Sequence, residues 1–139
     1  MAPPPPGQHY GTGLFTFPDG STFTGGWTAL GPAGEKSRHG EGSYVNGPES
    51  YEGSWKDDFM EGKGSQKFAS GASYDGIFAA GKYEGEGSYA FPDGAGYEGN
   101  WREGRMHGLG VYTDGEGVVF KGQFFNGSFN NGRAFVNLR

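Results

Sequence analysis

The sequence predicts an all-β fold, an elongated and twisted single-layer antiparallel sheet made of consecutive β-hairpins. Three observations predict this fold: a 23-residue period in the aromatic residues, thirty glycines among 139 residues, and turn-forming residues at one fixed place in each period. A repeat of this length is typical of arrays in which each unit contacts mainly its neighbours. We therefore expect one repeat array and not a conventional two-layer domain.

The chain divides into a proline-rich N-terminal arm, residues 1–9, and a repeat array, residues 10–139. The array begins with a half-repeat at 10–22, and full repeats start at residues 23, 51, 74, 97 and 120. About six extra residues after Trp27 lengthen the first full repeat, and the last repeat has Asn131 and Arg133 in place of its paired glycines. We interpret the two ends as caps, because a terminal unit lacks a neighbour on one side.

Each unit contains two aromatic columns. A first ring is followed two residues later by a glycine and four residues later by a second ring. Residues two apart on a strand share a face, so the rings and glycines line one side of the sheet. The second strand agrees, since Gly85, Gly87, Tyr89 and Phe91 share one parity. The first rings are Phe23, Tyr51, Tyr74, Tyr97 and Phe120, and the second rings are Trp27, Trp55, Phe78, Trp101 and Phe124.

The turns that close the hairpins recur at the same place in every unit. Pro-Asp-Gly occurs at 18–20 and 92–94, and Asn-Gly, Ser-Gly and Glu-Gly occur at 46–47, 70–71 and 116–117. Proline sets φ, aspartate supports an Asx turn, and glycine supplies a positive φ. About eleven strands follow from this pattern.

The aromatic face replaces a conventional core. Hydrophobic residues make up only 33% of the chain while aromatic residues make up 17%, and glycine lets a ring lie flat on a neighbouring strand. For any single ring, holding the sheet together is the stronger interpretation. The face as a whole is expected to stay exposed and to bind a partner, because nothing else in the chain covers a single layer.

A further column lies nine residues into successive units, stacked at one edge of the sheet. It forms either the rim of a partner site, where methionine is adaptable, or a plug for the open end of each hairpin. The two interpretations are equally supported. The column consists of Met60, Tyr83, Met106 and Phe129.

These columns resemble the MORN repeat, which reads approximately YEGxWxxGxxxGxG. Residues 51–55 and 97–101 carry its first part, Tyr-Glu-Gly-x-Trp, and the resemblance covers about residues 10–137. The sequence departs from the pattern at Asp58, where glycine is expected, and at Phe78 and Phe124, where tryptophan is expected. The resemblance implies an elongated scaffold whose grooved face receives a peptide or helix of another protein. Some family members also dimerise through their repeats, so a homodimer is compatible with it.

Composition and motifs exclude several other classes. The chain has no cysteine and no leader-like start, which predicts an intracellular protein, and its net charge of −5 without a basic cluster argues against nucleic acid. No apolar run approaches the roughly 20 residues of a membrane span. His9, His39 and His107 belong to separate units, so we expect no metal site. Because no nucleophile, phosphate loop or acid–base pair stands apart from the repeat, we expect no cofactor and no enzyme.

We therefore expect a non-catalytic scaffold that binds a helical or extended segment of a partner protein within a large assembly. The resemblance favours a cytoskeletal or ciliary (axonemal) complex, since short repeat-only members are frequent in cilia and flagella. The alternative is a phosphoinositide- or membrane-associated adaptor, which is disfavoured because basic residues are interleaved with acids. A docking arm that would adopt polyproline II is predicted at Pro3, Pro4, Pro5 and Pro6.

Overall fold

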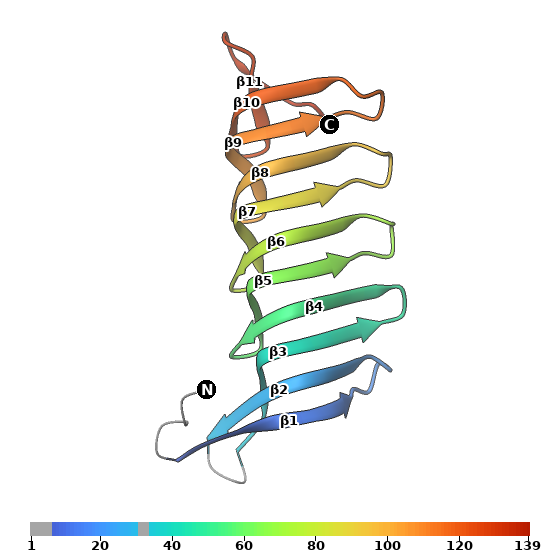
Figure 1. Cartoon of the computed structure of the whole chain (residues 1–139), viewed down its shortest axis with the longest axis vertical. Coiled ribbons are helices and arrows are strands. Elements are labelled where there is room, and N and C mark those ends of the chain that lie inside the picture. The colour runs from blue at the N-terminus through green and yellow to red at the C-terminus, as the bar shows by residue number, and fades with distance from the viewer. Residues whose placement is uncertain (1–6, 31–33) are drawn as a thin grey trace.

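The computed structural model describes residues 7–30 and 34–139. In this part of the chain, twelve strands follow one another in a single open antiparallel sheet, each hydrogen-bonded to the next (Figure 1). The all-β fold is confirmed, and the sheet has one strand more than the expected number of about eleven. The additional strand is β12, a short strand that pairs with β11. It lies in the degenerate last repeat, where the sequence pattern does not predict it. The strands are β1 (Gln8–Thr16), β2 (Thr22–Leu30), β3 (Ser37–Asn46), β4 (Glu49–Lys56), β5 (Phe59–Lys67), β6 (Ser73–Ala79), β7 (Lys82–Ala90), β8 (Gly96–Arg102), β9 (Arg105–Thr113), β10 (Val119–Phe125), β11 (Ser128–Asn130) and β12 (Phe135–Val136).

The loops at one edge of the sheet contain the predicted turn residues. Asp19 Oδ1 accepts a hydrogen bond of 2.8 Å from the Ser21 backbone N–H, and Gly20 has φ +87°. Asp93 accepts from the Ala95 N–H in the same way, at 3.1 Å. These are the Asx turns that the Pro-Asp-Gly sequence predicts. We call this edge the Pro-Asp-Gly edge.

The opposite edge, the turn edge, is formed by two-residue turns in which both residues have positive φ. In the turn between β4 and β5, Asp57 and Asp58 have φ of 47° and 75°. Ala80 and Gly81 repeat the geometry one unit later, with φ of 49° and 82°. Two positive φ values define a type I′ turn, whose twist matches that of the flanking strands. The hairpins β4–β5, β6–β7, β8–β9 and β10–β11 therefore close tightly at this edge, while β2 and β3 are joined by the longer insertion.

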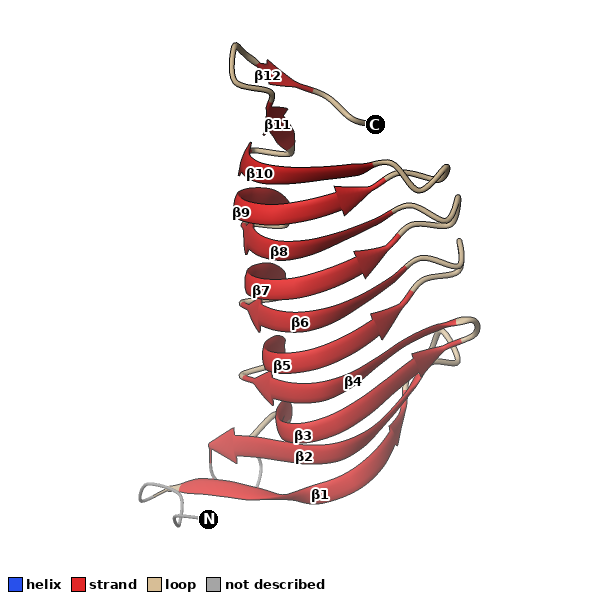
Figure 2. Ribbon diagram, turned by 45° about the horizontal axis from the view of Figure 1, so that its top comes forward, coloured by secondary structure: helices blue, strands red, loops and turns tan. Residues whose placement is uncertain are grey.

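A register shift near the turn edge bends the hairpins β2–β3, β4–β5, β6–β7 and β8–β9. Gly53 pairs with Gly64, but Trp55 pairs with Met60, so three residues of β5 lie opposite one residue of β4. Gly62 lies in this excess segment and has φ +72°, a conformation that favours glycine. The same shift recurs between β6 and β7 and between β8 and β9. Figure 2 shows the result, because the strands curl at this edge and the sheet becomes a trough.

The core is a continuous zigzag of eight rings along the inside of the trough, which we call the ring ladder. Trp55, Phe78 and Trp101 each pack edge-on between the first ring of their own unit and that of the unit before it, and Phe124 ends the ladder against Tyr97. Successive centroids lie 4.9–5.5 Å apart and the planes cross at 82–89°, the T-shaped geometry that aromatic pairs favour. In order, the ladder contains Phe23, Trp55, Tyr51, Phe78, Tyr74, Trp101, Tyr97 and Phe124.

The paired glycines leave the space in which the tyrosine rings of the ladder lie. A Cβ atom at Gly64 or Gly87 would collide with the ring of Tyr51 or Tyr74, so each ring lies on bare backbone. The Tyr74 hydroxyl then donates to the carbonyl of Ile77, at 2.9 Å. Hydroxyl groups of the other two ladder tyrosines donate likewise, which leaves no buried side-chain donor or acceptor of the described residues unpaired.

Exposure of the aromatic face was expected, and for the ladder this expectation is wrong. Its eight rings are only 0–6% exposed. The trough bends over its own rings near the turn edge, so a single sheet layer supplies its own cover. Trp27 and Phe120, the two remaining predicted rings, lie toward the ends of the array and are half-buried.

A candidate binding groove on the concave face

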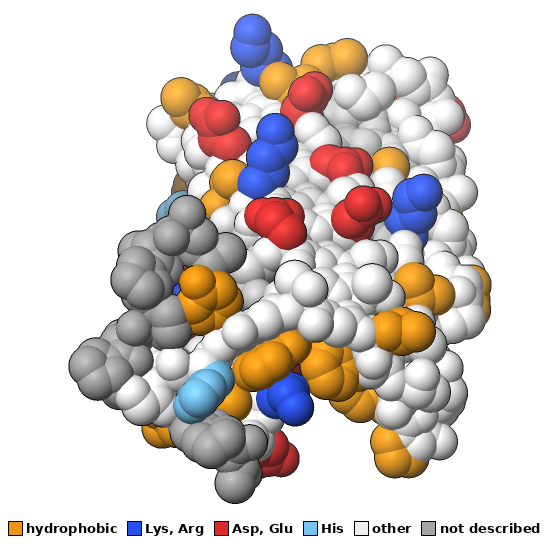
Figure 3. Space-filling model, turned by 60° about the horizontal axis from the view of Figure 1, so that its bottom comes forward, with side chains coloured by type: hydrophobic (Ala, Val, Ile, Leu, Met, Phe, Trp, Pro, Cys, Tyr) orange, Lys and Arg blue, Asp and Glu red, His pale blue; other side chains and the backbone are white. Residues whose placement is uncertain are grey.

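The concave face carries three hollows in a row, which we call together the ring groove. The first, of about 560 Å³, lies at the N-terminal end, and the next two have volumes of about 320 and 450 Å³. Arg38, Tyr44 and Asp58 line both the first and the second, and Phe68 lines both the second and the third. Seen toward the N-terminal end, hydrophobic side chains gather around this part of the surface (Figure 3). The hollows therefore form one interrupted channel along the array.

Half-buried aromatic side chains, the groove rings, line this channel above the ladder. They were not predicted as site residues, although Tyr89 and Phe91 share the strand parity of the paired glycines. Their columns are less regular than those of the ladder, since Gln66 stands where Tyr44 and Tyr89 stand in other units. The groove rings are Phe15, Phe17, Tyr44, Phe68, Tyr89 and Phe91.

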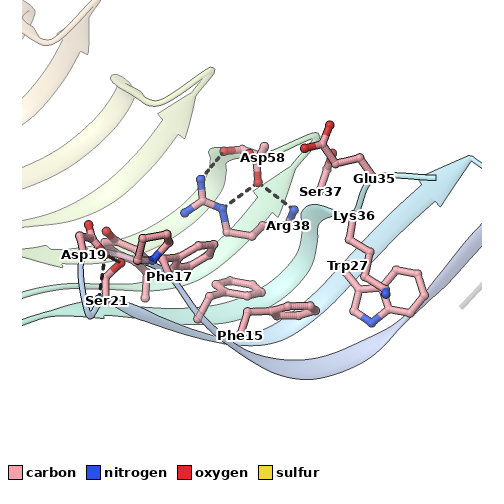
Figure 4. Close-up of a pocket in the computed structure, with 13 residues that line it drawn as sticks. Phe15, Phe17, Asp19, Ser21, Trp27, Glu35, Lys36, Ser37, Arg38 and Asp58 are labelled. Carbon is pink, nitrogen blue, oxygen red and sulfur yellow. Dashed lines mark hydrogen bonds and ion pairs between the residues drawn. The ribbon is translucent and has the colours of Figure 1, made fainter. Parts of the chain in front are cut away.

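Arg38 stands at the junction of the first two hollows. Its guanidinium lies 4.3 Å from the centre of the Trp55 ring and 5.6 Å from that of Tyr44, and its Nε donates to Asp58 Oδ1 at 2.8 Å (Figure 4). Burial alone would raise the pKa of Asp58, but hydrogen bonds from the backbone N–H and the side chain of Arg38 hold the pKa below its ordinary value. This pair explains why aspartate replaces the expected turn glycine.

Arg38 is the member of the rim column in the first full repeat, a position that the sequence pattern did not predict. It pairs with Trp27 as Met60 pairs with Trp55, but the inserted residues displace it from the 23-residue spacing. Its place in the column follows from strand pairing and not from sequence spacing.

The predicted rim residues pack on the ladder and also line the groove. The Tyr83 ring stacks on Tyr74 with centroids 3.8 Å apart, and burial raises the pKa of the Tyr83 hydroxyl. The backbone carbonyls of Met60 and Tyr83 accept N–H groups from the next turn. Met60, Tyr83 and Met106 line the second or third hollow, while Phe129 packs against Phe124 at 5.2 Å. The column therefore plugs the hairpins, and its role as a partner rim stays a prediction.

Two of the histidines have structural positions in a column of turn supports. Nδ1 of His39 accepts the backbone N–H of Asp57 at 3.2 Å, and Nδ1 of His107 accepts that of Asn126 at 3.4 Å. Glu61 and Glu84 occupy the same column and accept N–H groups from the next turns. Among the described residues, no group of three or more His, Cys, Asp or Glu side chains is placed to hold a metal ion.

At its C-terminal end the groove is partly filled by the chain itself. The tail, residues 137–139, returns so that the Arg139 guanidinium lies 3.6 Å from the centre of the Phe91 ring. Leu138 packs against the aromatic cluster. The predicted docking arm, Pro3 to Pro6, lies outside the described residues, as do residues 31–33 of the insertion.

The sheet and its groove define the class of the protein, an open repeat array of β-hairpins with an aromatic concave face. A family model described as MORN repeat matches residues 11–22, 51–73, 74–96 and 97–119, which is more than half of the chain. The chain belongs to the MORN-repeat family. A search of curated proteins found none that matches it.

MORN repeats fit a non-catalytic repeat protein that takes part in protein or membrane interactions. The family model leaves out residues 23–50 and 120–139, which contain the insertion and the shortened last unit. Phe23 and Phe124 nevertheless continue the ladder in these two segments. Within the described segments, the structure contains no helix that is long and apolar enough to cross a membrane.

Proposed function

We propose that this protein is a non-catalytic scaffold that holds a helical or extended segment of a partner protein in the ring groove. The observation that supports the proposal is the groove itself, three hollows that share lining residues and follow the long direction of the array. The rings of the ladder are buried and not accessible to a partner, so we assign binding to the half-buried groove rings. Aromatic anchors in pockets carry much of the binding energy in protein interfaces.

The groove suits a segment and not a small molecule. The lining of its second and third hollows is mainly apolar and includes the adaptable side chains of Met60 and Met106. Charged side chains such as Glu35 and Lys36 line the first hollow. A helix or strand laid along such a surface contacts several repeats at once. We propose that this partner belongs to a cytoskeletal or ciliary complex, a proposal that rests only on the family resemblance. A homodimer is a further candidate for covering the same face.

A site-specific photo-crosslinking experiment tests the proposal. A photoreactive phenylalanine analogue is placed at Phe68, inside the groove, or at Leu109, whose side chain is 62% exposed and shares the convex-face parity of Val111 and Glu98. The protein is then expressed in its native cell type and irradiated. We expect crosslinks to a partner from position 68 and few from position 109. Partner crosslinks from position 109 alone would overturn the groove proposal.

The phosphoinositide alternative has one local observation in its favour. Lys82, Arg102 and Arg105 line a common hollow at the turn edge, together with His107. Glu103 lies in the same hollow, which weakens its attraction for an anionic headgroup. Flotation with phosphoinositide-containing vesicles separates the two functions, since we expect no salt-sensitive binding. Salt-sensitive flotation that is lost in Arg102→Gln/Arg105→Gln would favour the alternative.

A further inference from the structure

The tail places one arginine in a cluster of groups that the repeat array builds. The guanidinium carbon of Arg139 lies 3.6 Å from the centre of the Phe91 ring, its Nη1 donates to the Tyr112 hydroxyl at 3.0 Å, and its Nη2 lies 3.3 Å from Asp93 Oδ2. Aromatic face, hydroxyl acceptor and carboxylate are the three kinds of group that a guanidinium binds best. The cluster is therefore complementary to an arginine side chain.

Each of these groups also has contacts within the array, apart from the tail. Asp93 is held by its own turn, because its carboxylate accepts a hydrogen bond from the Ala95 N–H. This hydrogen bond holds the pKa of Asp93 below its ordinary value, although burial acts to raise it, and Arg139 lowers the pKa further. Phe91 packs against Tyr89 with centroids 4.6 Å apart, and Tyr112 is only 2% exposed. The array thus holds an aromatic face and a carboxylate in place for a cation.

A second guanidinium in the groove is held in a similar way. Arg38 lies against Tyr44 and Trp55 and pairs with Asp58, as described above. Tyr44 and Tyr112 occupy equivalent positions, since each pairs with the first ring of its own repeat, Phe23 or Tyr97. The groove therefore combines the same tyrosine column with a nearby aspartate in two separate units.

We propose that Phe91, Tyr112 and Asp93 form an arginine-binding subsite of the ring groove, which Arg139 fills in the free protein and an arginine of the bound partner segment fills in the complex. This inference rests on the proposed function of the groove and names the chemistry of the partner. The Arg139 side chain is 35% exposed and that of Asp93 is 60% exposed, so the subsite can be reached from solvent. Its continuity with the third hollow places it in the path of a segment bound along the array. The net charge of −5 also favours a basic partner.

The experiment uses the full chain and a small probe, N-acetyl-arginine N-methylamide, with the citrulline analogue as the uncharged control. Arg139→Ala and Arg139→Gln both vacate the subsite, and the amide spectrum of each variant is compared with that of the wild type to verify folding. Ring signals of Phe91 and Tyr112 are followed by NMR during titration. We expect saturable shifts with the arginine probe in both variants, and about tenfold or greater weakening for citrulline or after the added change Asp93→Asn. Wild-type protein should bind the probe several-fold more weakly, because the tail competes.

Equal binding of the arginine and citrulline probes, or no effect of Asp93→Asn, would overturn the subsite. Binding by the wild type that equals that of both tail variants would overturn its occupation by Arg139. These failures are distinct from failure of the proposed function, because partner crosslinking from position 68 does not require an arginine in the partner. If crosslinking succeeds and the probe fails, the groove binds a segment without using this subsite.

Discussion

Tyr51, Tyr74 and Tyr97 each lie on a glycine of the next strand and join two successive rings of the ladder. The ring and glycine columns could be predicted from the sequence, because strand parity places them on one face. Their burial could not, since parity does not show that the strands curl. The expectation of an exposed face assumed a flat sheet.

The clearest test at this scale is Gly87→Ala. The added Cβ would collide with the Tyr74 ring and hydroxyl, so we expect a loss of about 1–3 kcal/mol in the free energy of unfolding. Gly96→Ala is the matched control, because a Cβ there meets only the Tyr89 carbonyl oxygen, at 3.4 Å. Urea unfolding of both variants gives the comparison. Equal stability of the two would show that the ring does not need bare backbone.

Tyrosine burial also predicts a loss of stability at high pH. Burial raises the pKa of Tyr51, Tyr74 and Tyr97 to about 12, while an unfolded tyrosine ionises near about 10. Between these values the folded chain retains protons that the unfolded chain releases, so the free energy of unfolding falls as pH rises through this window. Urea unfolding at pH 9 and pH 11 measures the fall, and Tyr74→Phe should make it smaller. A fall that Tyr74→Phe leaves unchanged would have another cause.

At the scale of the element, the hairpin is closed by a type I′ turn and bent by the register shift beside it. The sequence predicted the Pro-Asp-Gly loops because their residue types specify the backbone directly. The register shift could not be predicted, since an extra pair of residues in one strand leaves the 23-residue period unchanged. The insertion likewise concealed Arg38, which only strand pairing aligns with Met60.

Arg38 and Asp58 form one unit that replaces the methionine or aromatic residue of the rim column and the turn glycine. Asp58 has φ +75° where the equivalent residues are Gly81, Gly104 and Gly127. We expect Arg38→Met to lower the free energy of unfolding by about 1 kcal/mol, because the strained aspartate loses its partner. Adding Asp58→Gly should restore most of that loss. A double-mutant cycle by urea unfolding measures the coupling, and strictly additive effects would show that the two residues act independently.

Substitutions in the rim column test whether its residues have a structural role, a binding role or both. Met60 and Met106 are half-buried against the ladder, so Met60→Ser with Met106→Ser should lower the free energy of unfolding by about 1–2 kcal/mol for each methionine. If these residues also form a partner rim, the double variant should bind the partner identified by crosslinking more weakly than the wild type does. This affinity is measured at a temperature where the variant is still folded. Lost stability with unchanged partner binding would leave the column with its structural role alone.

At the scale of the whole molecule, a chain with few aliphatic residues folds by curling one sheet over its own aromatic face. The sequence was sufficient to predict the array, its hairpins and its family, because these follow from period and residue type. The groove was not predictable in the same way, since it depends on how strongly the trough closes. Its lining rings lie in less regular columns, and Arg139 reaches Phe91 through a contact 48 residues apart in the sequence.

The central claim is that the ladder holds the fold while the groove rings bind the partner. The most direct measurement pairs Phe68→Ser in the groove with Leu109→Ser on the convex face, and records the urea midpoint and the partner affinity of each variant. We expect Phe68→Ser to lower the free energy of unfolding by about 1–2 kcal/mol, because Phe68 is half-buried, and Leu109→Ser to change it little, because Leu109 is exposed. Partner affinity is therefore measured under conditions where both variants are fully folded. Partner affinity should fall about tenfold or more for Phe68→Ser only. Undiminished affinity in Phe68→Ser, or an equal loss in Leu109→Ser, would contradict the account.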